Sequence, residues 1–301
     1  MNDIFIKFSQ DIADHREVSR NILDMGKNFV KNARLEIPFE RLSVKRYFEK
    51  NIFSILFLSI YRAFRIPKKK RIYYGSINYC IRGIVTAADN ILDKEDKNIL
   101  DFSDLPKQSS NFKFILQIIV LEQLLSYLLK NTFLLSEIVD VLIKIGSLEA
   151  EEEAGQAKIL TPNSLLKKVH SFRGGALLNL AFLVPQALEL RLRKRFEEVK
   201  EGVHLLGIGL QILDDVVDFE KDLKDKRYNY LISSIEYRDG REEETTQKVV
   251  REAITFIKQG FKILRNLGYP LEERDTIELI RTLFYLRGLK NLWKQKYLRS
   301  I

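Results

Sequence analysis

The feature that most constrains this chain is a row of three aspartates, Asp214, Asp218 and Asp222, that recur every fourth residue. At 100° per residue, these side chains lie within about 80° of one another along a helix. Leu213 and Val217 flank them, so the acidic row borders an apolar surface. Such carboxylates repel, and burying them without a counter-charge is costly. Oxygen ligands with no His or Cys nearby select a hard cation such as Mg²⁺.

A solvated acidic helix face is the plain alternative in a chain with 30% charged residues. A second row favours the metal interpretation, because Asp89 and Asp93 are also four residues apart and follow the mostly apolar run 84–88. Two such rows, each at the C-terminal end of a helix, can face each other across a bundle. The predicted metal ligands are Asp89, Asp93, Asp214, Asp218 and Asp222.

The periodicity is helical almost throughout, and strand-like alternation is scarce. The 301 residues contain no Ser/Gly-rich linker and no fixed repeat, so we expect one all-α domain over residues 1–301. Helices are expected at about 40–65, 72–93, 111–130, 134–158, 163–190, 194–223, 243–266 and 272–298. Polar loops are expected at 94–110 and 224–242, next to both acidic rows, as a lid over a reactive site requires.

Composition narrows the function classes. A single cysteine, Cys80, excludes a disulfide framework and favours a reducing cytoplasm. No secretory signal is expected, and the longest uncharged run, Gly174–Leu188, is too short to span a membrane. The net charge of +9 is compatible with nucleic-acid binding, but the basic residues are dispersed and no groove-reading motif accompanies them, so no nucleic-acid partner is expected. An anionic small substrate or an anionic membrane surface explains the charge as well.

Four short segments follow one another in the order of the motifs of one enzyme family. Residues 89–93 read Asp-Asn-Ile-Leu-Asp, 155–157 Gly-Gln-Ala, 173–177 Arg-Gly-Gly-Ala-Leu, and 211–218 Gln-Ile-Leu-Asp-Asp-Val-Val-Asp. Over residues 45–231 the chain thereby resembles the polyprenyl diphosphate synthases, within the class I isoprenoid synthase fold. The last segment is specific by itself, and the others gain weight from their common order.

The resemblance implies a Mg²⁺-dependent prenyltransferase that ionises an allylic prenyl diphosphate and condenses it with a second prenyl substrate. It implies three Mg²⁺ ions bound together with the diphosphate, a bundle of about ten helices around a central cavity, and a homodimer. Catalytic roles fall on Asp89, Asp93, Asp214 and Arg173. Diphosphate binding falls on Lys45, Arg46, Gln156, Arg173, Gln211, Lys226 and Arg227.

Departures from the family pattern leave alternatives open. Asn90 replaces the second Asp of the first motif, and Ile159 replaces an Asp after Gln156. The Arg pair expected after the first motif is missing, and the segment 44–47 keeps only a basic pair of the glycine-rich motif. The site for a second substrate is therefore less well kept than the allylic site. A terpene cyclase or head-to-head synthase is one alternative; the aspartate spacing and Lys296-Tyr297 favour the cyclase, and the resemblance to head-to-head synthases is weaker. A non-catalytic subunit of a heteromeric synthase is the other.

Overall fold

The chain folds almost entirely into helices, as the sequence predicts. The computed structural model describes residues 2–31, 34–39, 41–93, 96–102, 110–130, 132–157, 160–238 and 241–289. In these ranges the only sheet is one antiparallel strand pair, β1 (Leu35–Glu36) with β2 (Asp101–Phe102), in which Leu35 lies opposite Phe102. The chain forms two compact units, Met1–Leu135 and Ser136–Ile301.

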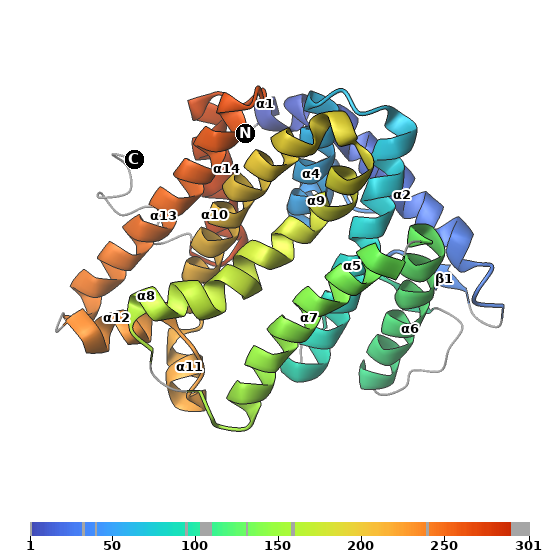
Figure 1. Cartoon of the computed structure of the whole chain (residues 1–301). Helices are drawn as coiled ribbons and strands as arrows, with labels where there is room; N and C mark the ends of the chain where they lie inside the picture. Colours follow the sequence, from blue (N-terminus) through green and yellow to red (C-terminus); the bar gives the residue numbers. More distant parts are fainter. Residues whose placement is uncertain are drawn as a thin grey trace. The chain divides into compact units, whose positions relative to one another are not determined.

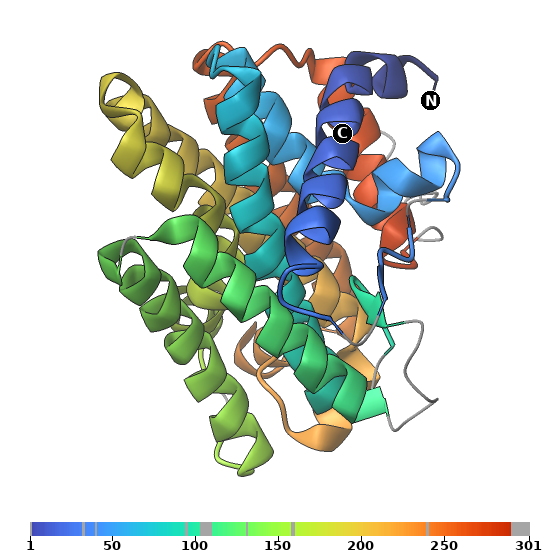
Figure 2. The ribbon, with the colours of Figure 1, turned by 90° about the vertical axis from the view of Figure 1, so that its right-hand side faces the viewer.

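In the first unit, four long helices pack side by side: α2 (Ser9–Gly26), α4 (Ile52–Ala63), α5 (Lys68–Asp93) and α6 (Ser110–Leu129) (Figure 2). The short helices α1 (Asn2–Lys7) and α3 (Val44–Lys50) accompany them. α4 is apolar nearly all round and therefore lies in the core. Buried Asp11 and Asp14 anchor α2 through Arg62 at 2.8 Å and Arg71 at 2.6 Å. This frame carries Asp89 and Asp93, here called the first acidic motif, at the end of α5.

In the second unit, α10 (Arg193–Val217) is the central helix and packs against α13 (Glu242–Asn266), α9 (Leu177–Leu188) and the π-helix η1 (Leu166–Ala176) (Figure 1). Five further elements belong to this unit: α8 (Pro162–Leu165), the 3₁₀ turn η2 (Leu190–Leu192), α11 (Phe219–Asp225), α12 (Tyr230–Arg238) and α14 (Glu273–Leu286). The helix α7 (Thr132–Glu153) begins just before the unit boundary.

The backbones of η1 and α10 touch at two glycines. A Cβ added to Gly207 would lie 2.3 Å from the carbonyl oxygen of Gly174, and a Cβ on Gly174 would lie equally close to the oxygen of Gly207. No side chain fits between these backbones. The approach brings Arg173 and His170 of η1 next to the end of α10.

Two expectations are wrong about the helices near Asp214, Asp218 and Asp222, here called the second acidic motif. The helix expected over 194–223 ends at Val217, and α11 follows after Asp218. The loop expected over 224–242 contains α12. The side chain of Asn229 starts α12, because its Oδ1 accepts the N–H groups of Leu231 at 2.9 Å and Ile232 at 3.1 Å.

Glycine turns end two helices earlier than expected. α7 stops at Glu153 instead of 158, because Gly155 has φ 64° and the N–H of Gln156 bonds to the oxygen of Glu151 at 2.8 Å. α14 stops at Leu286, and Gly288 with φ 75° follows it. The remainder of the helix predicted to 298 lies mostly outside the described residues.

α6 is the one described helix long and apolar enough to pass a composition test for a membrane span. Its window 111–129 has a mean hydropathy of 1.6, and 39% of that window is buried. A core helix passes the same test. Phe112, Ile115 and Ile119 leave a partly exposed apolar stripe on it.

Substitution of Gly207 by alanine tests the close contact with η1. We expect Gly207→Ala to lower the free energy of unfolding by about 2 kcal/mol or more, because the new methyl group meets backbone that cannot move aside. Gly146→Ala is the matched control, since a Cβ there meets nothing within 4 Å. It should raise the free energy of unfolding by about 0.5–1 kcal/mol through helix propensity. Equal urea midpoints for the two variants would contradict the contact.

Candidate active site

The first aspartate of the second motif is paired with an arginine from far along the chain. Asp214 lies in the last turn of α10, and its side chain is 38% exposed. Arg287, the residue after α14, places Nε 2.5 Å from Oδ1 and donates from Nη2 to Oδ2 at 3.0 Å. Asp218 is exposed where α10 ends. Asp214 and Asp218 thus supply carboxylate oxygens at one helix end.

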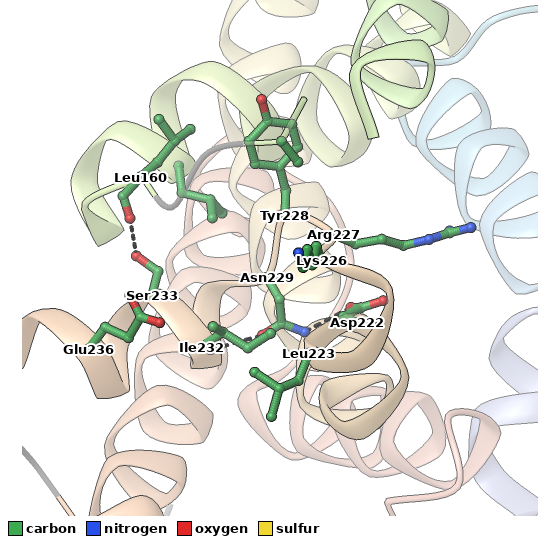
Figure 3. A pocket seen from close by; sticks show the side chains of 12 residues that line it. Leu160, Asp222, Leu223, Lys226, Arg227, Tyr228, Asn229, Ile232, Ser233 and Glu236 are labelled. Carbon is green, nitrogen blue, oxygen red and sulfur yellow. Dashed lines mark hydrogen bonds between the residues drawn. The ribbon is translucent and has the colours of Figure 1, made fainter. Parts of the chain in front are cut away.

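Asp222 lies in a different environment from the other two aspartates. It is buried, and its Oδ2 accepts a hydrogen bond from Nδ2 of Asn229 at 2.8 Å (Figure 3). Burial raises the pKa of Asp222 to about 6, and the carboxylates of Asp218 and Glu152 act in the same direction. The three aspartates therefore do not form one continuous exposed row. A metal-ligand role for Asp222 stays a prediction.

Asp215, which the sequence analysis passed over, is the buried centre of a polar network. Its Oδ2 accepts the N–H of Tyr230 at 2.5 Å and lies 2.9 Å from Nε2 of His170. Burial raises the pKa of the Asp215 carboxyl well above its ordinary range, although the Tyr230 hydrogen bond opposes this. The missed signal was its spacing from buried Ile208 and Ile212, which places Asp215 on the buried face of α10.

His170 is neutral in this network. Burial, followed by the charge of Arg173, lowers the pKa of His170 to about 3. Its Nδ1 is buried without a hydrogen-bond partner. The contact with Asp215 is therefore a buried hydrogen bond that joins η1 to α10, and not a pair of full charges.

The predicted diphosphate ligand Arg173 is engaged by two acids at the end of α7. Glu152 accepts from Nη1 at 3.1 Å and from Nη2 at 2.8 Å, and Oε1 of Glu149 lies 3.0 Å from Nη2. Burial opposes the charge of Arg173, but Glu152, Glu149 and Asp215 outweigh it and raise its pKa. Gln211, another predicted ligand, reaches Asp215 only through a long contact of 3.5 Å.

Lys226 and Arg227 come directly after α11. Lys226 ends that helix with φ 54° and ψ 43°, a left-handed conformation that non-glycine residues seldom adopt. In Figure 3 the side chain of Arg227 extends away from Leu160, Ser233 and Glu236. A cavity of about 280 Å³ adjoins this segment. It is lined by Ala157, Leu160, Leu165, Asp222, Leu223, Lys226, Arg227, Tyr228, Asn229, Ile232, Ser233 and Glu236.

The other predicted site residues are largely exposed. Lys45 and Arg46 lie on α3, and Nζ of Lys45 is 3.9 Å from Oε1 of Glu49. Gln156 is exposed after the turn that ends α7, and Asp89 is exposed on α5. The side chain of Asp93 lies outside the described residues. The two acidic motifs belong to different units, and that they face each other stays a prediction.

The structure explains why position 90 in the first motif is an asparagine. It is buried, its Nδ2 donates to the oxygen of Lys97 at 3.2 Å, and its Oδ1 accepts the N–H of Lys97 at 3.0 Å. An ionised aspartate cannot donate the first of these bonds. Asn90 therefore fastens the segment that follows α5.

The donor set fits a magnesium ion that takes few protein ligands. Among the described residues, no three His, Cys, Asp or Glu side chains converge on one metal position. Mg²⁺ commonly binds through one or two carboxylates and completes its shell with phosphate oxygens and water. Asp214 and Asp218 provide such oxygens, whereas the nearest histidine of the network, His170, is buried against Asp215.

Comparison with known proteins shows the fold. No protein-family model and no curated protein matches the sequence. Among solved structures, a decaprenyl diphosphate synthase from Rhodobacter capsulatus matches with a TM-score of 0.60 at 12% identity, covering 95% of this chain and 98% of that chain. A geranylgeranyl pyrophosphate synthase from Corynebacterium glutamicum gives 0.56 at 14%, covering 96% and 94%. A geranylgeranyl pyrophosphate synthetase from the archaeon Geoglobus acetivorans gives 0.53 at 15%, covering 93% and 98%. This chain has the all-α fold of these synthases, as the motif resemblance predicted.

The environment of Asp222 predicts a pH effect in the metal-free protein. A carboxyl whose pKa is about 6 when folded and about 4 when unfolded destabilises the fold as pH rises between these values, because the unfolded chain loses its proton first. Asp222→Asn keeps an oxygen acceptor for Asn229 and removes this titration. Its melting temperature relative to wild type should therefore rise from pH 4 to pH 6 and level off above about pH 7. Asp225→Asn, exposed on the same helix, is the control; a flat Asp222→Asn difference would refute the assignment.

Proposed function

We propose that this chain is a Mg²⁺-dependent prenyltransferase that ionises an allylic prenyl diphosphate and condenses it with a second prenyl substrate. The observation that carries the proposal is the placement of Asp214 and Asp218 at the end of α10, followed by Lys226 and Arg227, in a fold shared with polyprenyl diphosphate synthases. Carboxylates and cations lie close together in this segment of the second unit, which suits a metal–diphosphate ligand.

The residues divide the work of binding. Asp214 and Asp218, with Asp89 and Asp93 from the first motif, would hold the metal ions. Lys226 and Arg227 would bind the phosphate oxygens. Mg²⁺, when bound, supplies Lewis-acid and electrostatic stabilisation of the departing diphosphate. Arg287 pairs with Asp214 and compensates the charge of that carboxylate.

Prenyl transfer is preferred to terpene cyclisation because it depends less on Asp222. The cyclase interpretation rests on the regular spacing of aspartates 214, 218 and 222, whereas Asp222 is buried and bonded to Asn229, unlike the other two. Lys296 and Tyr297, which also favoured a cyclase, lie outside the described residues. The acceptor in prenyl transfer is a second prenyl substrate, with Lys45 and Arg46 as its predicted cationic contacts. A homodimer, peripheral membrane contact and a cytoplasmic location are further parts of the proposal.

A product assay tests the function directly. The purified protein is incubated with Mg²⁺ and an allylic diphosphate, with and without isopentenyl diphosphate, and the products are separated by chromatography. A longer prenyl diphosphate that forms only with isopentenyl diphosphate supports the proposal. A hydrocarbon formed from the allylic diphosphate alone would indicate a cyclase, and no turnover would indicate a non-catalytic subunit.

Single aspartate substitutions test the metal assignment. Asp89→Ala and Asp214→Ala should each lower turnover by about 100-fold or more, which equals about 2.7 kcal/mol of transition-state stabilisation. Asp225→Ala removes an exposed carboxylate beyond the motif and should change turnover by less than about threefold. If Asp214→Ala unfolds the metal-free protein but the remaining folded fraction keeps full activity, Asp214 is only the ion-pair partner of Arg287.

A further inference from the structure

Glu152 differs from its acidic neighbours at the end of α7. Glu151 and Glu153 are exposed, whereas the side chain of Glu152 is 3% exposed. An acid in the last turn of a helix opposes the helix dipole, and burial adds a desolvation cost. The position of Glu152 therefore reflects its partners and not the stability of α7.

The partners of Glu152 come from two separate parts of the second unit. Both terminal nitrogens of Arg173, on η1, donate to its two oxygens at 3.1 and 2.8 Å. The backbone N–H of Tyr228 donates to Oε1 at 2.7 Å. One carboxylate thus binds the predicted diphosphate ligand of η1 and the backbone just after Lys226 and Arg227.

The segment that carries these two cations is fixed from both sides. The hydroxyl of Tyr228 donates to Glu151 at 2.8 Å, on the side of α7. On the side of α10, Asp215 accepts the N–H of Tyr230 at 2.5 Å, and its backbone oxygen accepts from Asn229 at 2.7 Å. Of these acids, Glu152 binds both this segment and the guanidinium of Arg173.

We propose that Glu152 is a positioning residue of the diphosphate site, which sets the guanidinium of Arg173 and the segment of Lys226 and Arg227 at a fixed separation. The inference rests on the function proposed above. A positioning role and a purely electrostatic role predict opposite changes in anion affinity when the charge of Glu152 is removed. By Coulomb's law alone, removing a negative charge near an anion site tightens anion binding. Loss of positioning instead weakens anion binding.

Glu152→Gln tests the direction of this change, with Glu153→Gln as the matched control that removes the same charge from the exposed neighbour. Calorimetry with inorganic pyrophosphate and Mg²⁺ should give a Kd about tenfold weaker for Glu152→Gln and within about twofold of wild type for Glu153→Gln. Equal or tighter binding by Glu152→Gln would overturn the proposal. So would a reduced stoichiometry at unchanged Kd, because that is the signature of partial unfolding alone.

Hydrogen exchange in the unliganded protein provides a second readout that does not depend on the proposed function. Glutamine places an NH₂ donor where one carboxylate oxygen stood and carries no charge, so it loses the bond from Nη2 of Arg173 and accepts the Tyr228 N–H more weakly. Exchange of the 226–230 amides should accelerate in Glu152→Gln and not in Glu153→Gln; unchanged exchange would overturn the proposal. If wild type binds no pyrophosphate, the prenyltransferase function fails, while exchange still decides the positioning role.

A double variant covers the case in which Glu152→Gln does not fold. Glu152→Gln with Arg173→Gln leaves no unpaired buried charge between these two positions, so it should fold. It lacks the carboxylate that accepts the Tyr228 N–H, so the 226–230 amides should exchange faster than in wild type. Exchange as slow as in wild type would contradict the positioning role.

Discussion

The contact of η1 with α10 at Gly174 and Gly207 is the constraint on which the second unit depends. Because no side chain separates the two backbones, His170 of η1 lies within hydrogen-bond distance of Asp215 on α10. On the same helix η1, Arg173 binds Glu152 of α7. The polar network around the second acidic motif is thus a geometric consequence of close helix packing.

Two buried carboxylates fix the backbone of the segment that follows α11. Glu152 and Asp215 accept the N–H groups of Tyr228 and Tyr230, two residues apart on one segment. Buried charges contribute little net stability, since desolvation offsets their attraction. What they provide here is position. The segment after α11 takes its conformation from α7 and α10, and Lys226 and Arg227 are carried on a backbone held at both sides.

The sequence predicted what depends on local pattern. Apolar periodicity located α5, α6 and α13 within a few residues, and ordered motifs indicated the fold. The break at Asp218 was missed because four-residue spacing is equally compatible with one continuous helix. The contact that removes Asp222 from the row comes from Asn229, beyond the expected helix. Glu152 and Arg287 were missed for the same reason, since their roles arise from partners 21 and 73 residues away. Whether Asp89 and Asp214 share metal ions depends on the two units together and stays a prediction.

The pairing of Asp214 with Arg287 has a consequence for the order of events during synthesis. The two residues are 73 positions apart, and Arg287 is synthesised after Asp214. At cellular translation rates, Asp214 is synthesised on the order of 10 s before Arg287. During that interval Asp214 lacks the ion-pair partner that follows α14. The pair of Asp214 and Arg287 therefore forms only after α14 has been translated.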